Sequence, residues 1–283
     1  MNNMKMSILD KRDIFYVDNL IYSNSCNDLF KNTILCSPSD FAIVNGAFYN
    51  NFVYASGKRN LKNRTTSYFL QNSYSGYNYC INCDGGSIWT SHNDSSIGIR
   101  PVILFDNIPN FLVDRVISGK ENDFLFFGEY PNSICNPFLS TILDSLYRCK
   151  SLTVTGRSYT CFMNDSYVKL PEYLYNGNRY VRCKVNPFNG IFARLSNGFI
   201  YTSGSYAWIR VEPVKWFTYF DNNKLISCNV VLSGIMFDSK EFYDGNFDNT
   251  LMCGFLNSYL INDMIYQSRD YDNVLSKCKI KKK

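Results

Sequence analysis

The sequence predicts an α+β fold in which short antiparallel strands and hairpins are combined with two or three helices. Short apolar runs bounded by Gly, Pro or Asn, such as residues 124–127, are typical of buried strands. The pair Asn176-Gly177 between two apolar runs predicts a hairpin. Apolar residues recur at helical spacing over residues 136–147 and 251–264, which predicts two helices with one buried face each.

A first, short helix is predicted to begin at the sequence Ser-Pro-Ser-Asp, residues 37–40. Ser37 is the expected N-cap, Pro38 lies in the first turn, and Gly46 is expected to end the helix. Residues 102–105 then form a continuous apolar run, which predicts a buried strand. The first half of the chain therefore combines a short helix with at least one strand of the core.

The second half of the chain contains further helix and strand signals. Asn136 and Pro137 are typical of an N-cap and a first helical residue. Trp216 is expected in the core, because Trp is highly buried on average. Strands are expected at residues 206–211, 215–220 and 224–232, of which the last two are joined by a turn.

Length and charge exclude several classes of protein. A chain of 283 residues can bury a sizeable core as one large domain or as two small ones. The net charge of +5 equals the five lysines that lie within residues 277–283, so the rest of the chain is neutral overall. A basic tail is usually a solvated terminus, and no basic stripe with interleaved aromatic residues accompanies it. We therefore expect no nucleic-acid partner.

The cysteines and the first residues indicate where the chain is made. The 11 cysteines are odd in number and scattered, unlike a disulfide framework. The N-terminal sequence has no apolar segment long enough for a signal peptide, and no run approaches the length of a membrane span. We expect a protein made in a reducing bacterial cytoplasm without a signal peptide and without membrane insertion.

Metal ligands are too few for a site, so no metal and no cofactor is expected. Cys80 and Cys83 form one CxxC pair with His92 nearby, but a structural zinc site needs four ligands. There is no second CxxC and no second His. Calcium needs six to eight oxygen ligands, and the same region offers only a thin set: Asn82, Asp84, Asn93 and Asp94.

Residues 73–96, here called the polar-aromatic segment, contain Tyr and Trp alternating with Ser, Gly and Asn, without any Lys, Glu, Arg, Gln or Met. Rigid aromatic rings beside small polar groups are typical of antibody-like binding surfaces. Residues 84–87, Asp-Gly-Gly-Ser, fit a hairpin turn. The alternative is a turn-rich surface without a partner. The predicted ligand-binding residues are Tyr74, Tyr77, Asn78, Tyr79, Asn82, Trp89, Ser91, His92, Asn93 and Asp94.

Four short blocks carry a resemblance to a known family: SPSDFA at 37–42, GIRPVI at 98–103, FGEYP at 127–131 and VEPVKW at 211–216. In these blocks the chain resembles a bacterial and phage domain family of unassigned function. That family is related to the C-type-lectin-like fold of formylglycine-generating-type proteins and of the variable target proteins of diversity-generating retroelements. The resemblance covers roughly residues 35–265 and implies a C-type-lectin-like fold. Residues 67–72 depart from it, since a Trp-rich strand usually stands there.

The order of the blocks implies a circular permutation. In the family the GxRPV strand comes last, whereas here it precedes FGEYP. The first and last strands of such folds are neighbours, so we expect residues 102–105 to lie antiparallel to residues 124–127 in one sheet. The alternative is two half-domains split near Asn107. The expected parts are an N-terminal extension (1–36), a single domain (37–266) of permuted halves 37–106 and 124–266 with the joining loop 107–123, and a basic tail (267–283).

The resemblance and the polar-aromatic segment together predict a non-enzymatic recognition protein. We expect a phage virion protein or a phage-encoded adhesin that binds a host-surface protein or glycan. A structural virion component, whose partners are other virion subunits, is the alternative. An enzyme is disfavoured, because His92 is the single histidine and lies in a polar segment without a triad partner.

Overall fold

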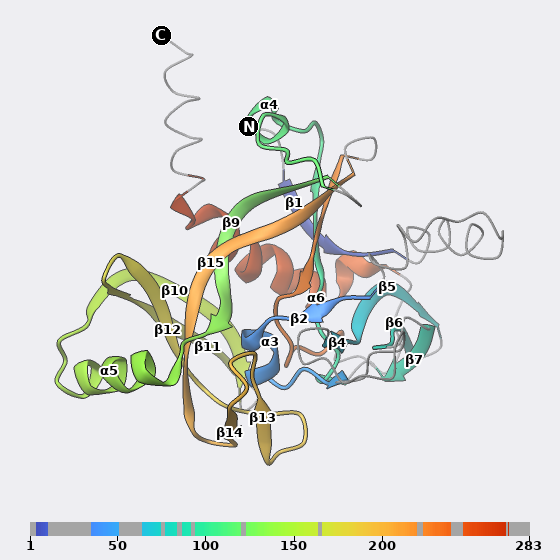
Figure 1. Cartoon of the computed structure of the whole chain (residues 1–283). Coiled ribbons are helices and arrows are strands. Elements are labelled where there is room, and N and C mark those ends of the chain that lie inside the picture. The colour runs from blue at the N-terminus through green and yellow to red at the C-terminus, as the bar shows by residue number, and fades with distance from the viewer. Residues whose placement is uncertain are drawn as a thin grey trace, which may run out of the picture.

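An eight-stranded antiparallel sheet forms the centre of the computed structural model (Figure 1). The strand order is β1-β8-β16-β15-β12-β11-β10, and β9 pairs with β15. The structure describes residues 4–10, 35–50, 64–74, 77–83, 87–91, 94–119, 123–163, 166–219, 223–238, 246–269 and 271. The strands of this sheet are β1 (Met4–Ile8), β8 (Pro101–Phe105), β9 (Phe124–Ile134), β10 (Thr153–Met163), β11 (Ser166–Tyr175), β12 (Asn178–Lys184), β15 (Tyr206–Tyr219) and β16 (Lys224–Ser227).

The long strand β15 holds the sheet together. It pairs with β12 over residues 206–210, with β16 over residues 216–219, and with β9 over residues 209–217. The two strands expected at 206–211 and 215–220 are therefore one. Trp216 is fully buried, as predicted, and its indole N–H donates to the Phe127 carbonyl at 2.7 Å.

The predicted hairpin at Asn176-Gly177 is confirmed. These two residues join β11 to β12, and their φ angles of 48° and 73° lie in the left-handed region. Two-residue hairpin turns need positive φ at both positions, which Asn and Gly adopt at low cost.

The segments 102–105 and 124–127 lie in one sheet and run in opposite directions, as expected, but the predicted neighbour relation is wrong. β8 pairs with β1 on one side and with β16 on the other, so β16 and β15 separate it from β9. The physical reason is that both edges of β8 are occupied by other strands.

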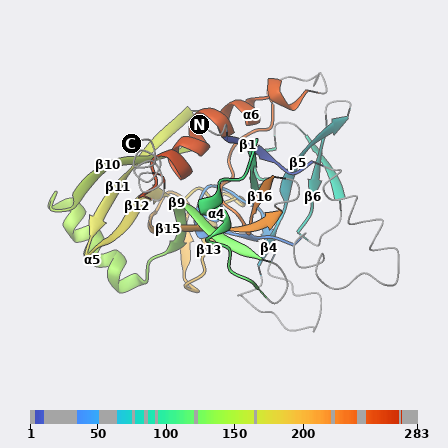
Figure 2. The ribbon, with the colours of Figure 1, turned by 90° about the horizontal axis from the view of Figure 1, so that it is seen from above.

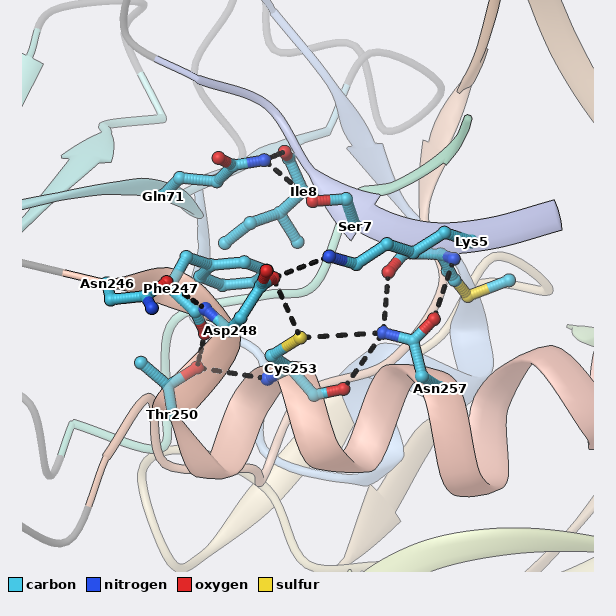
Figure 3. Close-up of polar contacts among 11 residues, drawn as sticks. Lys5, Ser7, Ile8, Gln71, Asn246, Phe247, Asp248, Thr250, Cys253 and Asn257 are labelled. Atoms are coloured by element: carbon cyan, nitrogen blue, oxygen red, sulfur yellow. Dashed lines mark hydrogen bonds and ion pairs between the residues drawn. The ribbon is translucent and has the colours of Figure 1, made fainter. Parts of the chain in front are cut away.

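The first described strand, β1, is held by residues from distant parts of the chain (Figure 3). The Asn257 side chain accepts a hydrogen bond from the Met6 N–H and donates one to the Met6 carbonyl, both at 2.9 Å. The Gln71 amide donates to Ser7 Oγ at 2.6 Å and to the Ile8 carbonyl at 2.7 Å. The expected N-terminal extension thus contributes a strand to the main sheet.

Smaller sheets surround the main one. A three-stranded sheet contains β5 (Tyr68–Tyr74), β6 (Tyr77–Ile81) and β7 (Ser87–Ser91). The strand expected over residues 224–232 is divided into β16 and β17. The remaining pairs are β13 (Phe192–Arg194) with β14 (Ile200–Thr202), β17 (Asn229–Val230) with β2 (Ser37–Pro38), and β3 (Tyr49–Asn50) with β4 (Thr65–Thr66).

Helix starts follow the capping residues, with one correction. Ser39, not Ser37, is the N-cap of α3, and its Oγ accepts the Ala42 N–H at 2.9 Å. Ser37 is unsuited to this role because β2 pairs with β17, which keeps its backbone extended. Asn136 caps α5 as predicted. The helices are α3 (Asp40–Val44), α4 (Asn110–Val113) in the expected joining loop, α5 (Pro137–Arg148), η2 (Phe247–Asn249), α6 (Leu251–Phe255), η3 (Leu256–Leu260) and η4 (Asn262–Tyr266).

The segments α6, η3 and η4 form one continuous C-terminal helix along one face of the main sheet (Figure 2). Its apolar face is buried, as the helical spacing predicts. Gly128 of β9, with φ of 73°, permits the closest approach: a Cβ there would lie 2.6 Å from the Met264 carbonyl oxygen. The fold is α+β, in agreement with the sequence.

Candidate functional site

The polar-aromatic segment forms most of the sheet β5-β6-β7, and its flanks are fixed in the core. Phe69 at the start of β5 is fully buried, and its N–H donates to the Gly98 carbonyl at 3.1 Å. The Gly98 N–H donates to the Ser67 carbonyl at 2.9 Å. A Cβ on Gly98 would lie 2.3 Å from a Val230 methyl group, so only glycine fits between these backbones. A rigid base therefore supports the segment.

The register of the three strands gathers the predicted aromatic positions. Trp89 is the Cα partner of Tyr79, while Tyr74 and Ser91 are both partners of Tyr77. Directly opposed residues of an antiparallel pair share a face, and so do alternate residues of one strand. These five positions consequently lie on one face of β5-β6-β7.

Exposure differs among the predicted residues of β6. Tyr77 is 55% exposed, and Tyr79 is half-buried against the apolar cluster that includes Ile81. Asn78 is fully buried, because strand alternation places it on the core side with Cys80. Its amide has no hydrogen-bond partner within the described part of the chain. We therefore remove Asn78 from the predicted contact residues.

Asn82 and Asp94 are engaged in local hydrogen bonds. Asn82 Oδ1 accepts the Cys83 N–H at 2.8 Å and the Ser67 hydroxyl at 3.2 Å. Asp94 accepts from the Thr90 hydroxyl at 2.7 Å and from the Ser96 N–H at 2.9 Å. Both side chains shape the loops beside the aromatic face.

Some predicted features lie outside the described residues. They are His92, Asn93 and the turn at residues 84–86, although β6 and β7 pair on either side of that turn. For Tyr74, Trp89 and Ser91 the structure describes the backbone alone. Tyr77 and Tyr79 are therefore the aromatic residues of the segment whose side chains are placed.

A second polar site, which the sequence did not predict, lies where the FGEYP and VEPVKW blocks meet. β9 and β15 pair so that Tyr130 faces Glu212 and Glu129 faces Pro213. Arg210 and Glu212 lie on this stretch of β15, with their closest N and O atoms 3.9 Å apart. The Asn132 amide donates to Glu212 Oε2 at 2.8 Å. The only signal in the sequence was the presence of the two blocks, whose side chains come together only through pairing.

A buried ion network forms one wall of this second site. Arg179 of β12 binds both Glu129 and Glu172, and Arg157 lies 3.5 Å from Glu129. Glu172 also accepts the Tyr159 hydroxyl at 2.7 Å and the Thr155 hydroxyl at 2.8 Å. Burial and the Glu172 carboxylate raise the pKa of Tyr159, which keeps this hydroxyl a donor. The network is fully paired and suits a structural role.

The described residues contain no group of three or more His, Cys, Asp or Glu that could hold a metal ion. Burial raises the pKa of the Cys80 thiol well above its ordinary value, so this predicted zinc candidate keeps its proton at neutral pH. Thiolate, not thiol, binds zinc.

Thiol reactivity is expected to separate Cys149 from Cys135, Cys161 and Cys228. Cys149 is exposed, whereas burial raises the pKa of each of the other three to about 12. A pKa near 12 leaves roughly one thiol in ten thousand ionised at pH 8, and only the thiolate attacks an alkylating reagent. Peptide mass spectrometry after brief iodoacetamide treatment at pH 8 should find Cys149 modified before these three cysteines. The same treatment in urea is the control, and equal rates for Cys161 and Cys149 in the folded protein would contradict the described burial.

None of the described helices has the length and apolarity needed to cross a membrane. Comparisons with known proteins found no matching protein-family model, no matching curated protein and no matching solved structure.

Proposed function

We propose that the protein is a non-enzymatic recognition protein, carried on a phage virion or encoded by a phage as an adhesin. The face of β5-β6-β7 that bears Tyr74, Tyr77, Tyr79, Trp89 and Ser91 binds a host-surface protein or glycan. The supporting observation is the strand register, which brings these positions together around the exposed Tyr77. Recognition energy usually concentrates in a few aromatic anchors surrounded by polar contacts.

The proposal includes a circularly permuted C-type-lectin-like fold in which the two halves form one domain. Contacts between the halves support a single domain. β8 of the first half pairs with β16 of the second, and β2 pairs with β17. The Ser39 N–H also donates to the Val230 carbonyl at 2.9 Å. These pairings favour one domain over two separate half-domains.

Replacing Tyr77 by Ala tests the proposed surface. We expect binding to bacterial cells or surface polysaccharides to weaken about tenfold or more, because a central aromatic anchor typically contributes about 2 kcal/mol or more. The free energy of unfolding should change by less than about 0.5 kcal/mol, since the ring is 55% exposed. Flow cytometry with labelled protein measures the binding, and urea titration measures the stability.

Phe138→Ala is the matched control, because Phe138 is a highly exposed aromatic residue on α5, away from β5-β6-β7 (Figure 1). This variant should bind as the wild type does. Undiminished binding by Tyr77→Ala, or loss of folding in that variant, would assign the segment a structural role.

A structural virion component is the second candidate, and a different surface favours it. Exposed apolar side chains gather on the β13-β14 hairpin and the chain next to it: Phe188, Ile191, Phe192, Phe199 and Ile200. Apolar groups gathered in this way often mark an interface. Assembly of the purified wild-type chain at micromolar concentration, measured by sedimentation, would favour this candidate, whereas a monomer would favour recognition.

A further inference from the structure

A cavity of about 480 Å³ opens at the second polar site, where β15 changes partners. The pairing with β12 ends at Arg210 and the pairing with β16 begins at Trp216. Among the described strands, only β9 pairs with β15 between these residues. Residues of β9, β12 and β15 line the cavity together with Arg269, which follows the C-terminal helix. Its volume lies within the range of about 300–1,000 Å³ that is typical of small-molecule sites.

The inner wall of the cavity carries no net charge to offer a ligand. The charged residues of this wall are Glu129 and Arg179. They belong to a neutral set with Glu172 and Arg157, in which the two guanidinium groups bind the two carboxylates. Glu129 additionally accepts the backbone N–H of Arg269 at 3.1 Å. Buried carboxylates that are paired in this way are poor acceptors for a further partner. Recognition of a charged ligand therefore depends on the remaining groups at the rim.

Two guanidinium groups at the rim, those of Arg210 and Arg269, have N–H donors available for a ligand. Arg210 is 49% exposed; its Nη2 donates to Asn178 Oδ1 at 2.7 Å, and its Nη1 lies 3.9 Å from Glu212. Arg269 is exposed, and its guanidinium has no ion pair within the described part of the chain. With Glu212, these groups leave one net positive charge at the rim. Planar guanidinium groups bind a carboxylate through two parallel hydrogen bonds.

The rest of the lining suits hydroxyl groups and an apolar ring face. Asn132 offers an amide group, Glu212 offers carboxylate oxygens, and Phe126 and Pro213 form an apolar side. The Asn178 amide is already engaged, since its oxygen accepts from Arg210 and its nitrogen donates to the Asn176 carbonyl. An adjoining cavity of about 240 Å³ shares four of these residues and adds Lys215, Ser227 and Asn229, which leaves room for an attached sugar residue. We propose that this site binds a sugar acid with one carboxylate, in which Arg210 and Arg269 hold the carboxylate and Asn132 and Glu212 bind hydroxyl groups.

Titration calorimetry with sodium D-glucuronate tests this proposal, with D-glucose and acetate as matched probes. We expect saturable binding of glucuronate near the millimolar range, and binding of glucose and of acetate at least about tenfold weaker, because each lacks half of the recognised groups. The variant Arg210→Gln/Arg269→Gln should lose at least about tenfold in glucuronate affinity. Arg148→Gln, at an exposed arginine of α5, should bind as the wild type does.

Three results would overturn the proposal. Equal binding of glucose would show that the charge is not recognised, equal binding of acetate would show that the sugar is not recognised, and no saturable binding of glucuronate would show that there is no site. The cavity lies at β9, β12 and β15, whereas β5-β6-β7 packs beside the edge strand β1, which β8 and β16 separate from β15 (Figure 1). Tyr77→Ala is therefore expected to leave glucuronate binding unchanged, so the two proposals are tested independently of each other.

Discussion

Replacing Trp216 by Ala is expected to lower the free energy of unfolding by about 3–5 kcal/mol, the usual cost of truncating a fully buried Trp. The side chain lies where β15 pairs with both β9 and β16, so its loss leaves a cavity at the junction of three strands. Loss of the indole N–H also leaves the Phe127 carbonyl without its 2.7 Å hydrogen bond. Urea unfolding followed by circular dichroism measures the change.

Trp216→Phe removes the hydrogen bond but keeps most of the packing. It keeps an aromatic ring and loses the hydrogen bond, so a smaller loss is expected, of about 1–3 kcal/mol for the unsatisfied carbonyl together with the reduced volume. A Trp216→Ala protein that unfolds at the same urea concentration as the wild type would mean that the β9-β15 junction does not support the fold.

Replacing Arg179 by Met is expected to cost about 3–5 kcal/mol, because it leaves buried carboxylates without their shared counter-ion. Glu172 is fully buried and Glu129 nearly so, and both bind this one guanidinium. Combining Arg179→Met with Glu172→Gln should recover part of the loss, since the amide carries no charge to desolvate. A double-mutant cycle in urea gives this coupling.

Arg182→Met is the matched control on the same strand. Arg182 lies 3.2 Å from Asp144, and both side chains are partly exposed. Its guanidinium also lies over the Tyr147 and Tyr206 rings, so a loss of about 1–2 kcal/mol is expected, smaller than that of Arg179→Met. If Arg179→Met is no more destabilising than Arg182→Met, the buried network does not hold β12 in the sheet.

Local signals predicted the elements that depend on a few neighbouring residues. Asn136-Pro137 and Asn176-Gly177 fix a helix start and a hairpin through backbone geometry and capping, which distant contacts rarely override. Ser37 shows the limit of such local signals. A second serine stands at position 39, and the pairing of β2 with the remote β17 makes Ser39 the cap instead. The same remoteness explains why residues 102–105 pair with β1 and β16 and not with the predicted neighbour.

The two candidate sites differ in the same way: one depends on local sequence and the other on distant contacts. The alternation of Tyr77 and Tyr79 is visible in the sequence. The same alternation puts Asn78 on the opposite, buried face, which composition alone does not reveal. The cavity at β15 could not be predicted, because Arg210 and Arg269 are brought beside it by strand pairing and by the docking of the C-terminal helix.

The two hydrogen bonds between Met6 and Asn257 join residues 251 positions apart. They can form only after Asn257 has been synthesised, which limits the order in which the chain folds. At the usual rate of translation, on the order of tens of seconds pass between the synthesis of the first strand and that of the helix that secures it. Contacts of such long range also slow folding. During this interval β1 has an unprotected edge, the kind of surface through which nascent chains aggregate. The edge of β1 is therefore expected to stay open to other chains until Asn257 has been synthesised and docked.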